Sequence, residues 1–230
     1  MSPRLTAVLV LVIATTANPA LAIVDQEFAP IPGDLYRVAN VGSSNNIDWA
    51  QTFTVGVSGL LTGVDVWIAR ESVVSEPLIY DIRTVVAGKP SDPDFGPNIL
   101  ASGIIPAHSI PLVSVDLQPP TNPTHLGFGA GSFSVNAGMV LAIVLQTNDP
   151  GTTDARVAYQ WNGRSPGSIA PGYDGGDDWV RLLGLGGANW EAGESNDLYF
   201  RTYVQIPEPA GSSLCIGIAI TLSAVCRRGR

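Results

Sequence analysis

Residues 50–70 read AQTFTVGVSGLLTGVDVWIAR, and this stretch decides the fold class. Phe53 and Val55 share one face with threonines on the other, and Val64 and Val66 repeat the alternation after a Val-Ser-Gly turn. A period of two residues is typical of a β-strand with one buried face, because successive side chains point to opposite sides. The stretch therefore predicts strands separated by a tight turn.

The same alternation recurs in residues 78–83 (LIYDIR) and 198–204 (LYFRTYV). Residues 139–147 (MVLAIVLQT) are more continuously apolar, which predicts a central strand covered on both faces. Turns separate these runs, and the chain contains 25 Gly and 18 Pro. No helical period is sustained between residues 25 and 205, so we expect eight to ten strands in a single antiparallel β-sandwich.

Composition limits the classes of partner. Hydrophobic residues make up 45% of the chain and charged residues 14%, which is too apolar for a disordered protein. Four of the twelve basic residues lie at the chain ends, and without them 8 basic residues face 20 acidic ones, a net charge of −12. Such an acidic body argues against nucleic acid as a partner, because it offers no basic patch to release counterions.

The first 22 residues are typical of a secretory signal peptide. Arg4 precedes an apolar run at residues 7–14, and Ala20 and Ala22 form an A-x-A cleavage site. We therefore expect export through the inner membrane by the Sec machinery and removal of residues 1–22 by signal peptidase.

The last 24 residues combine a motif, an uncharged stretch and a basic end. In order, they are Pro207, Glu208 and Pro209, then residues 210–226, then Arg227, Arg228 and Arg230. As a helix, the 17 uncharged residues span about 25 Å, the short limit for a bilayer core of about 30 Å. The terminal arginines would stay in the cytoplasm, so the pattern predicts a C-terminal transmembrane helix. The two cysteines, Cys215 and Cys226, also lie here, so the body has no disulfide.

This arrangement resembles the PEP-CTERM sorting signal of Gram-negative bacteria, which consists of a Pro-Glu-Pro motif, one transmembrane helix and a terminal basic cluster. The resemblance implies recognition by an exosortase-type membrane peptidase, transient anchoring in the membrane, and delivery to the cell surface or the medium. Such proteins tend to occur with exopolysaccharide and biofilm production. A plain C-terminal anchor without sorting is the alternative. We expect a signal peptide at 1–22, a β-sandwich domain at 23–206, and a sorting and anchor segment at 207–230.

Several body segments together resemble a β-sandwich module that is common in exported bacterial proteins and similar to jelly-roll carbohydrate-binding domains. They are AQTFTVGVSGLLTGVDVWIAR, YDIRTVVAGKP, FSVNAGMVLAIVLQ and DLYFRTYV. The likeness spans roughly residues 49–205 and implies a jelly-roll-like body. It is a pattern of strands and turns, and it carries no diagnostic binding motif.

No catalytic site stands out. Residues 163–167 match G-x-S-x-G, but the sequence that follows cannot form the required helix, and both histidines precede Ser165. Two histidines without a body cysteine exclude a standard Cys/His zinc site. We expect His108 and His125 to be solvated loop residues. Paired carboxylates are too common here to indicate a glycosidase, so the sequence favours a non-enzyme.

The stretch from residue 159 to residue 197 interleaves aromatic rings with carboxylates. Its rings include Trp161, Tyr173, Trp179 and Trp190. Sugar sites use aromatic rings against the apolar face of a pyranose and carboxylates for its hydroxyls, so the stretch predicts carbohydrate binding. The alternative is that Trp161 and Trp179 belong to the core and that the acids are solvated loop tips.

Clustered oxygen ligands also suit a structural Ca²⁺. Asp174, Asp177 and Asp178 are the first candidate ligands, and Asn45, Asn46 and Asp48 form a second group. Neither group follows the EF-hand spacing.

The sequence thus predicts an exported, non-catalytic protein of the extracellular polysaccharide or biofilm matrix that binds carbohydrate. A structural or adhesive surface domain without a specific ligand is the first alternative. A polysaccharide-active hydrolase or lyase is the second.

Overall fold

A computed structural model describes most of the body of the chain: residues 21–33, 36–42, 46–71, 74–92, 98–113, 118–147, 158–165, 167–168, 171–183, 189–193 and 197–207. Residues 22–206 form one compact unit. Its strands are β1 (Ala22–Phe28), β2 (Tyr36–Gly42), β3 (Ile47–Thr54), β4 (Gly59–Val66), β5 (Ile68–Arg70), β6 (Leu78–Val86), β7 (Lys89–Pro90), β8 (Ile99–Ile105), β9 (Thr124–Gly127), β10 (Phe133–Val135), β11 (Val140–Thr147), β12 (Ala158–Arg164), β13 (Asp178–Leu182), β14 (Glu191–Ala192) and β15 (Phe200–Gln205). Two 3-10 helices are η2 (Ala107–Ser109) and η3 (Gly129–Gly131).

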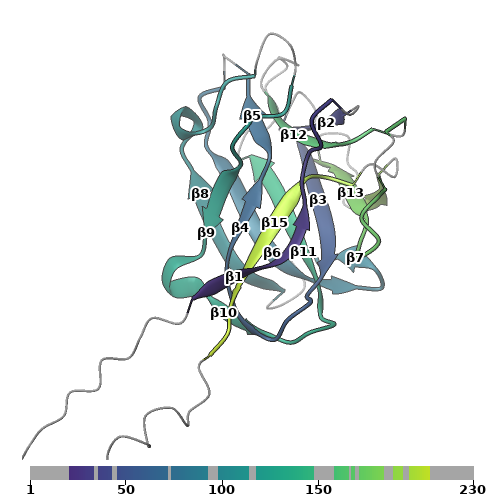
Figure 1. Cartoon of the computed structure of the whole chain (residues 1–230). Coiled ribbons are helices and arrows are strands. Elements are labelled where there is room, and N and C mark those ends of the chain that lie inside the picture. Colours follow the sequence, from purple (N-terminus) through teal and green to yellow (C-terminus); the bar gives the residue numbers. More distant parts are fainter. Residues whose placement is uncertain are drawn as a thin grey trace, which may run out of the picture. The chain divides into compact units, whose positions relative to one another are not determined.

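The smaller sheet has the order β1-β15-β4-β10, and β9 also pairs with β4 (Figure 1). Strand β10 pairs with residues 59–61 of β4 and β9 pairs with residues 63–66, so the two short strands follow one another along the same edge. All pairings in this sheet are antiparallel.

The larger sheet has the order β5-β12-β2-β3-β11-β6-β7, with β8 added to β6 and β13 added to β3. Strand β14 pairs with β13 and completes a hairpin. Strand β2 meets β3 at a single pair, Gly42 and Ile47, while β13 pairs with residues 47–51. Ile47 thus pairs with both β2 and β13, so these two strands lie on opposite edges of β3, and β2 shares its edge with β11.

The main core lies between the two sheets, because alternate residues of both sheets meet there. Val64, Val66 and Phe200 come from the smaller sheet, and Phe53 and Ile143 come from the larger one; all five are fully buried. The rings of Phe53 and Phe200 lie 5.7 Å apart between centroids and join the sheets directly. This is the packing of a β-sandwich, built from the period-two pattern of the sequence.

A second, smaller cluster covers the outer face of the larger sheet. It consists of Ala50, Ala142, Val144 and Trp190, all buried. The two alanines lie on the central strands β3 and β11 and leave space, which the indole of Trp190 fills. Strand β11 is therefore buried on both faces, as its continuously apolar sequence predicts.

The predicted all-β, antiparallel fold is confirmed. The described strands outnumber the eight to ten expected, because several, such as β7 and β14, are only two residues long. The signal helix predicted for residues 1–22 and the transmembrane helix predicted within 207–230 fall almost entirely outside the described residues. Within the described part of the chain, no helix has the length and apolarity needed to cross a membrane.

Candidate functional site

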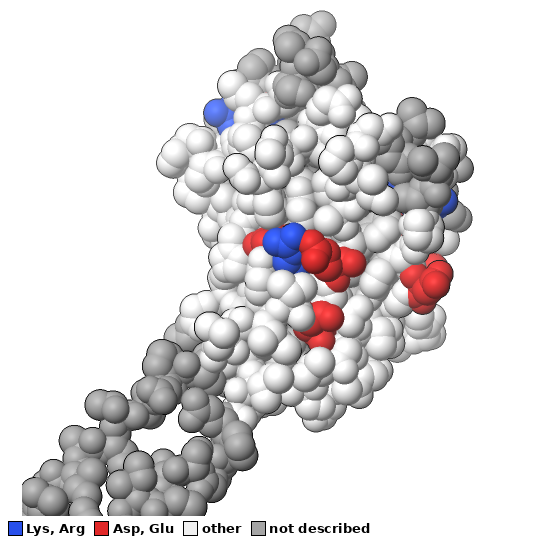
Figure 2. Space-filling model, in the orientation of Figure 1, with Lys and Arg blue, Asp and Glu red and all other residues white. Residues whose placement is uncertain are grey.

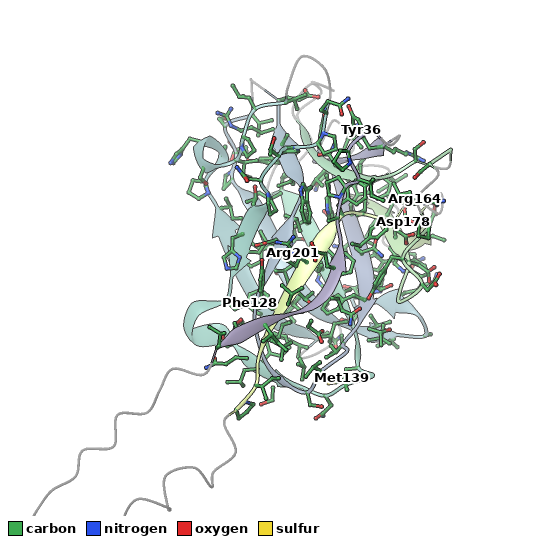
Figure 3. The ribbon with its side chains drawn as sticks, viewed as in Figure 1. Tyr36, Phe128, Met139, Arg164, Asp178 and Arg201 are labelled. Carbon is green, nitrogen blue, oxygen red and sulfur yellow. The ribbon has the colours of Figure 1, made fainter. Side chains whose placement is uncertain are left out.

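A row of four polar side chains crosses the outer face of the smaller sheet. The strand register places Glu27 of β1, Arg201 of β15, Asp65 of β4 and His125 of β9 directly opposite one another. The row alternates carboxylates with Arg201 and His125, and such cross-strand neighbours stabilise a sheet. Figure 2 shows blue and red atoms together in the middle of a face that is otherwise mostly uncharged, and Figure 3 labels Arg201 at that place.

The imidazole of His125 is held in one orientation although 60% of the side chain is exposed. Its Nδ1 lies 2.7 Å from Oδ1 of Asp65, and the hydroxyl of Tyr203 donates to Oδ2 of Asp65 at 2.5 Å. The ring also packs edge-on against Tyr203, with centroids 5.9 Å apart. Because a carboxylate only accepts, Nδ1 carries the hydrogen of this contact, and Nε2 is the ring nitrogen directed away from Asp65.

Two opposed glycines make room for this ring. Gly63 of β4 and Gly127 of β9 are direct partners in the sheet. A Cβ on Gly63 would lie only 2.7 Å from Cε1 of His125, so a side chain there would displace the imidazole. The glycine pair therefore lets the imidazole lie close to the sheet surface.

Arg201 supports the row from the other side of Asp65. It binds the carboxylate of Glu27, and its Nη1 lies 3.8 Å from Asp65. Hydrogen bonds with Tyr203 and Glu27 raise the pKa of Arg201 further above its usual value. Its guanidinium also lies 5.5 Å from the ring centre of Trp67, within the range of a cation–π contact.

His125 lines a groove of about 780 Å³, named here the His125 groove. The other lining residues are Ile105, Ser109, Pro111, Leu112, Gln118, Pro119, Pro120, Thr121, Asn122, Pro123 and Thr124. This volume lies within the range typical of small-ligand sites.

A second groove of about 280 Å³, named the Tyr36 groove, lies on the other side of residues 118–121. Its lining residues are Pro30, Ile31, Pro32, Gly33, Tyr36, Gln118, Pro119, Pro120, Thr121 and Tyr199. Among the described residues that line the two grooves there is no Lys, Arg, Asp or Glu, although the chain as a whole is acidic. Their polar groups are amides, hydroxyls and one imidazole.

Both grooves lie at one end of the smaller sheet. That end is formed by opposed residues of four strands: Phe28, Phe200, Val66 and Thr124. The opposite end is formed by Ala22, Gln205 and Leu60, about 20 Å away along seven-residue strands. Residues 30–33 follow the first end and residues 118–123 precede it, so the grooves lie far from both ends of the compact unit. Figure 3 shows Tyr36 near the top of the view and Met139 near the bottom.

The rings predicted to bind sugar lie in two places, the main core and the outer face of the larger sheet. Trp161 of β12 is fully buried in the main core, and its Nε1 donates to the carbonyl oxygen of Tyr199 at 3.0 Å. Tyr173 is half-buried against Phe200, and burial raises the pKa of its hydroxyl to about 12. Trp190 is buried on the outer face of the larger sheet, and Trp179 beside it is half-buried. None of these four rings lines the His125 groove or the Tyr36 groove.

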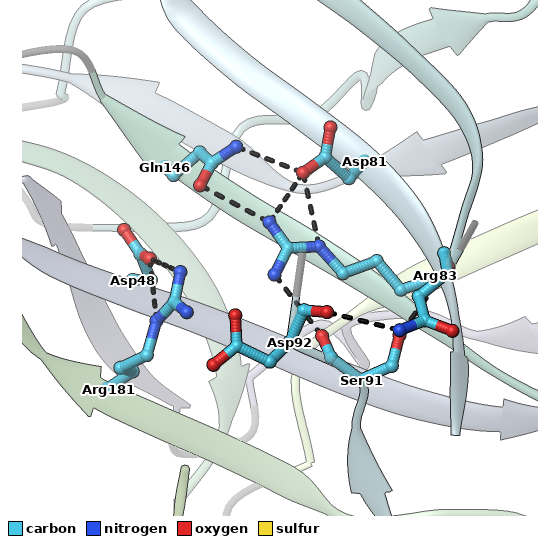
Figure 4. Close-up of polar contacts among 8 residues, drawn as sticks. Asp48, Asp81, Arg83, Ser91, Asp92, Gln146 and Arg181 are labelled. Atoms are coloured by element: carbon cyan, nitrogen blue, oxygen red, sulfur yellow. Dashed lines mark hydrogen bonds and ion pairs between the residues drawn. The ribbon is translucent and has the colours of Figure 1, made fainter. Parts of the chain in front are cut away.

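The same outer face holds two buried ion pairs (Figure 4). Arg181 donates to Oδ2 of Asp48 from Nε at 3.1 Å and Nη2 at 2.6 Å. Arg83 donates to Oδ2 of Asp81 at 3.1 and 2.5 Å, and Gln146 donates to the same oxygen at 3.0 Å. All four charged residues are buried.

An aromatic ring covers the Arg181 side of this cluster. The indole of Trp190 lies 4.9 Å from the guanidinium carbon of Arg181, and Lys89 donates to the carbonyl oxygen of Trp190 at 3.1 Å. Burial raises the pKa of Asp48, while the hydrogen bonds and charge of Arg181 oppose that rise. The cluster is therefore a sealed, internally paired structure with little access for a ligand.

The predicted Ca²⁺ ligands differ in their exposure to solvent. Asp174 and Asp177 are exposed and Asp178 is buried. In the second group, Asp48 is paired with Arg181, and Asn45 lies outside the described residues. No group of three or more His, Cys, Asp or Glu side chains suited to a metal occurs in the described part of the chain. The Ca²⁺ site stays a prediction.

Most of the predicted sorting and cleavage residues lie outside the described part of the chain. These are Ala20, Glu208, Pro209, Arg227, Arg228 and Arg230. Ala22 is the first residue of β1 and pairs with Gln205, and Pro207 follows β15 and is exposed. The processing of both ends stays a prediction.

Comparison with protein-family models finds no match for this chain, and comparison with curated proteins finds none either. The site must therefore be judged from its own chemistry. Sequence reasoning missed His125, Asp65 and Tyr203 as neighbours, since they come from three strands far apart in the chain. A faint signal was the alternation of Thr124-His125-Leu126-Gly127, in which Leu126 is fully buried and His125 points outward.

Proposed function

We propose that this chain is an exported, surface-sorted and non-catalytic protein whose jelly-roll-like β-sandwich binds extracellular polysaccharide. The observation that carries the proposal is the pair of grooves at the end of the smaller sheet opposite Ala22 and Gln205, whose described lining residues include no Lys, Arg, Asp or Glu. A domain attached through either end of its chain would present these grooves away from the attachment point.

The two ends of the sequence support the cellular part of this proposal. A signal peptide at residues 1–22 would export the domain, and the Pro-Glu-Pro motif, apolar stretch and arginines of residues 207–230 would address it to an exosortase-type peptidase. The predicted order of events is Sec export, transient anchoring, and transfer to the cell surface or the medium.

We propose that the protein is not catalytic, because the side chains of the cross-strand row are bonded to one another. Both oxygens of Asp65 and the hydroxyl of Tyr203 are used within the row, and Arg201 is bound to Glu27. These groups stabilise one another and hold His125, which suits a fixed binding surface better than a pair of carboxylates facing each other across a cleft.

A structural or adhesive domain without a specific ligand is the second candidate. Burial of Trp161 and Trp190 favours it, because neither ring leaves a face open for a sugar. It differs from the main proposal in one respect that can be measured, namely whether the protein binds polysaccharide at all.

The first test is affinity electrophoresis of the protein, secreted by its own host, in gels containing the exopolysaccharide of that host. Retardation relative to gels without polysaccharide supports the binding proposal, and unchanged mobility favours the structural candidate. Intact-mass analysis of the same sample tests the sorting proposal. A mass lacking residues 1–22 and the end of the chain beyond the Pro-Glu-Pro motif supports it, whereas an inner-membrane protein that retains Arg230 contradicts it.

A further inference from the structure

We infer that the His125 groove and the Tyr36 groove are two halves of one site for a neutral, hydroxyl-rich glycan that crosses residues 118–121. The inference rests on the proposed function and adds the class of the polysaccharide and the residues that hold it. The evidence is the shared wall, the charge of the lining, its rigidity, and two oriented side chains.

The two grooves share one short segment as a common wall. Residues Gln118 to Thr121 line both the space beside His125 and the space beside Tyr36. A ligand confined to one groove would leave the other unused. A chain of several sugars can occupy both, because successive units can continue past this common segment.

The lining chemistry selects against charged polymers. An anionic polysaccharide needs lysine or arginine in its site, and a cationic one needs carboxylates, but the described lining residues include neither. Of the row beside His125, Asp65 contacts the imidazole and Arg201 is paired with Glu27. Amide and hydroxyl side chains of the lining, such as Asn122 and Thr124, can both donate to and accept from sugar hydroxyls.

The walls are unusually stiff. Six prolines line the two grooves: Pro30, Pro32, Pro111, Pro119, Pro120 and Pro123. Proline fixes φ and has no N–H, so these segments offer a rigid apolar surface and expose few backbone donors. A rigid wall lowers the entropy cost of binding. This lower cost is important for a ligand that is bound by several weak contacts.

His125 supplies the oriented polar contact at one end. Its Nδ1 faces Asp65, its ring rests over Gly63, and Tyr203 contacts its edge, so Nε2 is the ring nitrogen that can bond a ligand hydroxyl. An exposed histidine would otherwise move among several rotamers. The four strands of the row therefore fix a contact that an isolated surface histidine could not provide.

Tyr36 supplies the ring at the other end. It is the first residue of β2, it is half-buried, and its register partner is Arg164 of β12, so its backbone is fixed by the larger sheet. An aromatic ring at a groove wall covers the apolar face of a pyranose. This assigns to Tyr36 the stacking role that the sequence alone placed on Trp161, Tyr173, Trp179 and Trp190.

The test uses the secreted full-length protein, with affinity electrophoresis against dextran, glucomannan and xylan as neutral probes and alginate and hyaluronan as anionic ones. The variants are Tyr36→Ala and His125→Ala. His108→Ala is the matched control, because His108 is exposed in η2 and lines neither groove. Thermal unfolding verifies that each variant is folded.

We expect a neutral glycan to retard the unaltered protein to the same extent in low salt and in about 0.5 M NaCl. Each of the two variants should lose roughly three- to tenfold in affinity, as removal of one hydrogen bond or one stacking contact implies. The His108 variant should bind normally. Loss in only one variant would overturn the single-site inference.

Binding restricted to alginate or hyaluronan, and abolished by salt, would overturn the neutral-glycan inference while leaving polysaccharide binding intact. Binding of a neutral glycan that both variants retain would place the site elsewhere on the domain. Failure to bind every probe and also the host exopolysaccharide would overturn the proposed function itself. These outcomes therefore distinguish failure of the glycan-site inference from failure of the proposed function.

Discussion

The outer faces of the two sheets carry similar charges and use them differently. On the larger sheet, Asp81 and Arg83 are paired and buried beneath covering residues, with side-chain exposures of 4% and 1%. On the smaller sheet, Asp65 and Arg201 belong to a row that ends in the exposed His125, and Arg201 keeps 27% of its side chain accessible. An aspartate and an arginine on a sheet face therefore do not by themselves indicate either a structural or a functional role.

The difference arises from what covers each face. The β13–β14 hairpin and Trp190 cover the larger sheet, where Ala50 and Ala142 leave space for the indole. The smaller sheet has glycines instead, Gly63 and Gly127, and the space above them holds the imidazole of His125. Burial turns the first set of charges into a structural element, and exposure leaves the second set able to position a ligand contact.

The largest expected effect comes from breaking the buried pair. Replacing Arg83 by Met removes the donors at 3.1 and 2.5 Å from Asp81 and leaves a buried carboxylate with only Gln146 as a partner. We expect the free energy of unfolding to fall by about 3 to 5 kcal/mol. Urea unfolding followed by tryptophan fluorescence measures it.

The control for Arg83→Met is the double variant Asp81→Leu/Arg83→Met, which removes both charges. Because an apolar pair of similar volume avoids the desolvation cost, most of the lost stability should return. If the double variant is as unstable as the single one, the loss reflects packing and the electrostatic explanation is wrong.

A smaller loss of stability is expected at high pH, where buried tyrosine hydroxyls ionise. Burial raises the pKa of Tyr159 and of Tyr173 to about 12 from an ordinary value of 10. The unfolded chain then ionises first, so stability is complete below pH 10 and is lost as the pH rises through 12. For the fully buried Tyr159, two pKa units correspond to about 2 to 3 kcal/mol.

Unfolding midpoints in urea between pH 9 and 12 measure this loss, and absorbance at alkaline pH follows phenol ionisation. The variant Tyr159→Phe starts from a lower stability, because its hydroxyl no longer donates to the carbonyl oxygen of Glu76. It should nevertheless lose less stability than the unaltered protein between pH 10 and 12. Equal losses in both proteins would contradict the assigned pKa of Tyr159.

Much of the fold could be predicted from local pattern. Alternation placed Phe53, Val64, Val66 and Ile82 in the core, and the continuous apolar run identified β11 as a strand covered on both faces. These predictions succeed because the period of two residues is a property of the strand alone. They require no knowledge of which strands become neighbours.

The candidate site could not be predicted in the same way, because it depends on register between distant strands. His125 meets Asp65 across 60 residues of chain, and Tyr203 meets the same carboxylate across 138. Trp161 shows the converse. The sequence predicts a sugar-binding role for this ring, but pairing of β12 with β2 and β5 places it in the core. The alternation in residues 78–83 places Asp81 and Arg83 on the face opposite Tyr80 and Ile82, and only the tertiary cover determines that this face is buried.

The smallest expected effect tests the exposed half of the comparison directly. Arg201→Met changes the same residue type as Arg83→Met, but its partner Glu27 is exposed and Asp65 retains its bonds with Tyr203 and His125. We expect a loss of about 0.2 to 1 kcal/mol, decreasing further in 1 M salt, because solvent screens exposed pairs. Urea unfolding under both salt conditions measures it.

The glycan affinity of the Arg201→Met variant helps to interpret its small loss of stability. Since Tyr203 and Asp65 still hold the imidazole of His125, the Arg201→Met variant should bind within about twofold of the unaltered protein. A loss of stability as large as that of Arg83→Met would show that the row is as structural as the buried pair, and the contrast between the two faces would fail. A small loss of stability with a large loss of affinity would instead make Arg201 part of the binding surface, because only a direct contact with the glycan separates those two quantities.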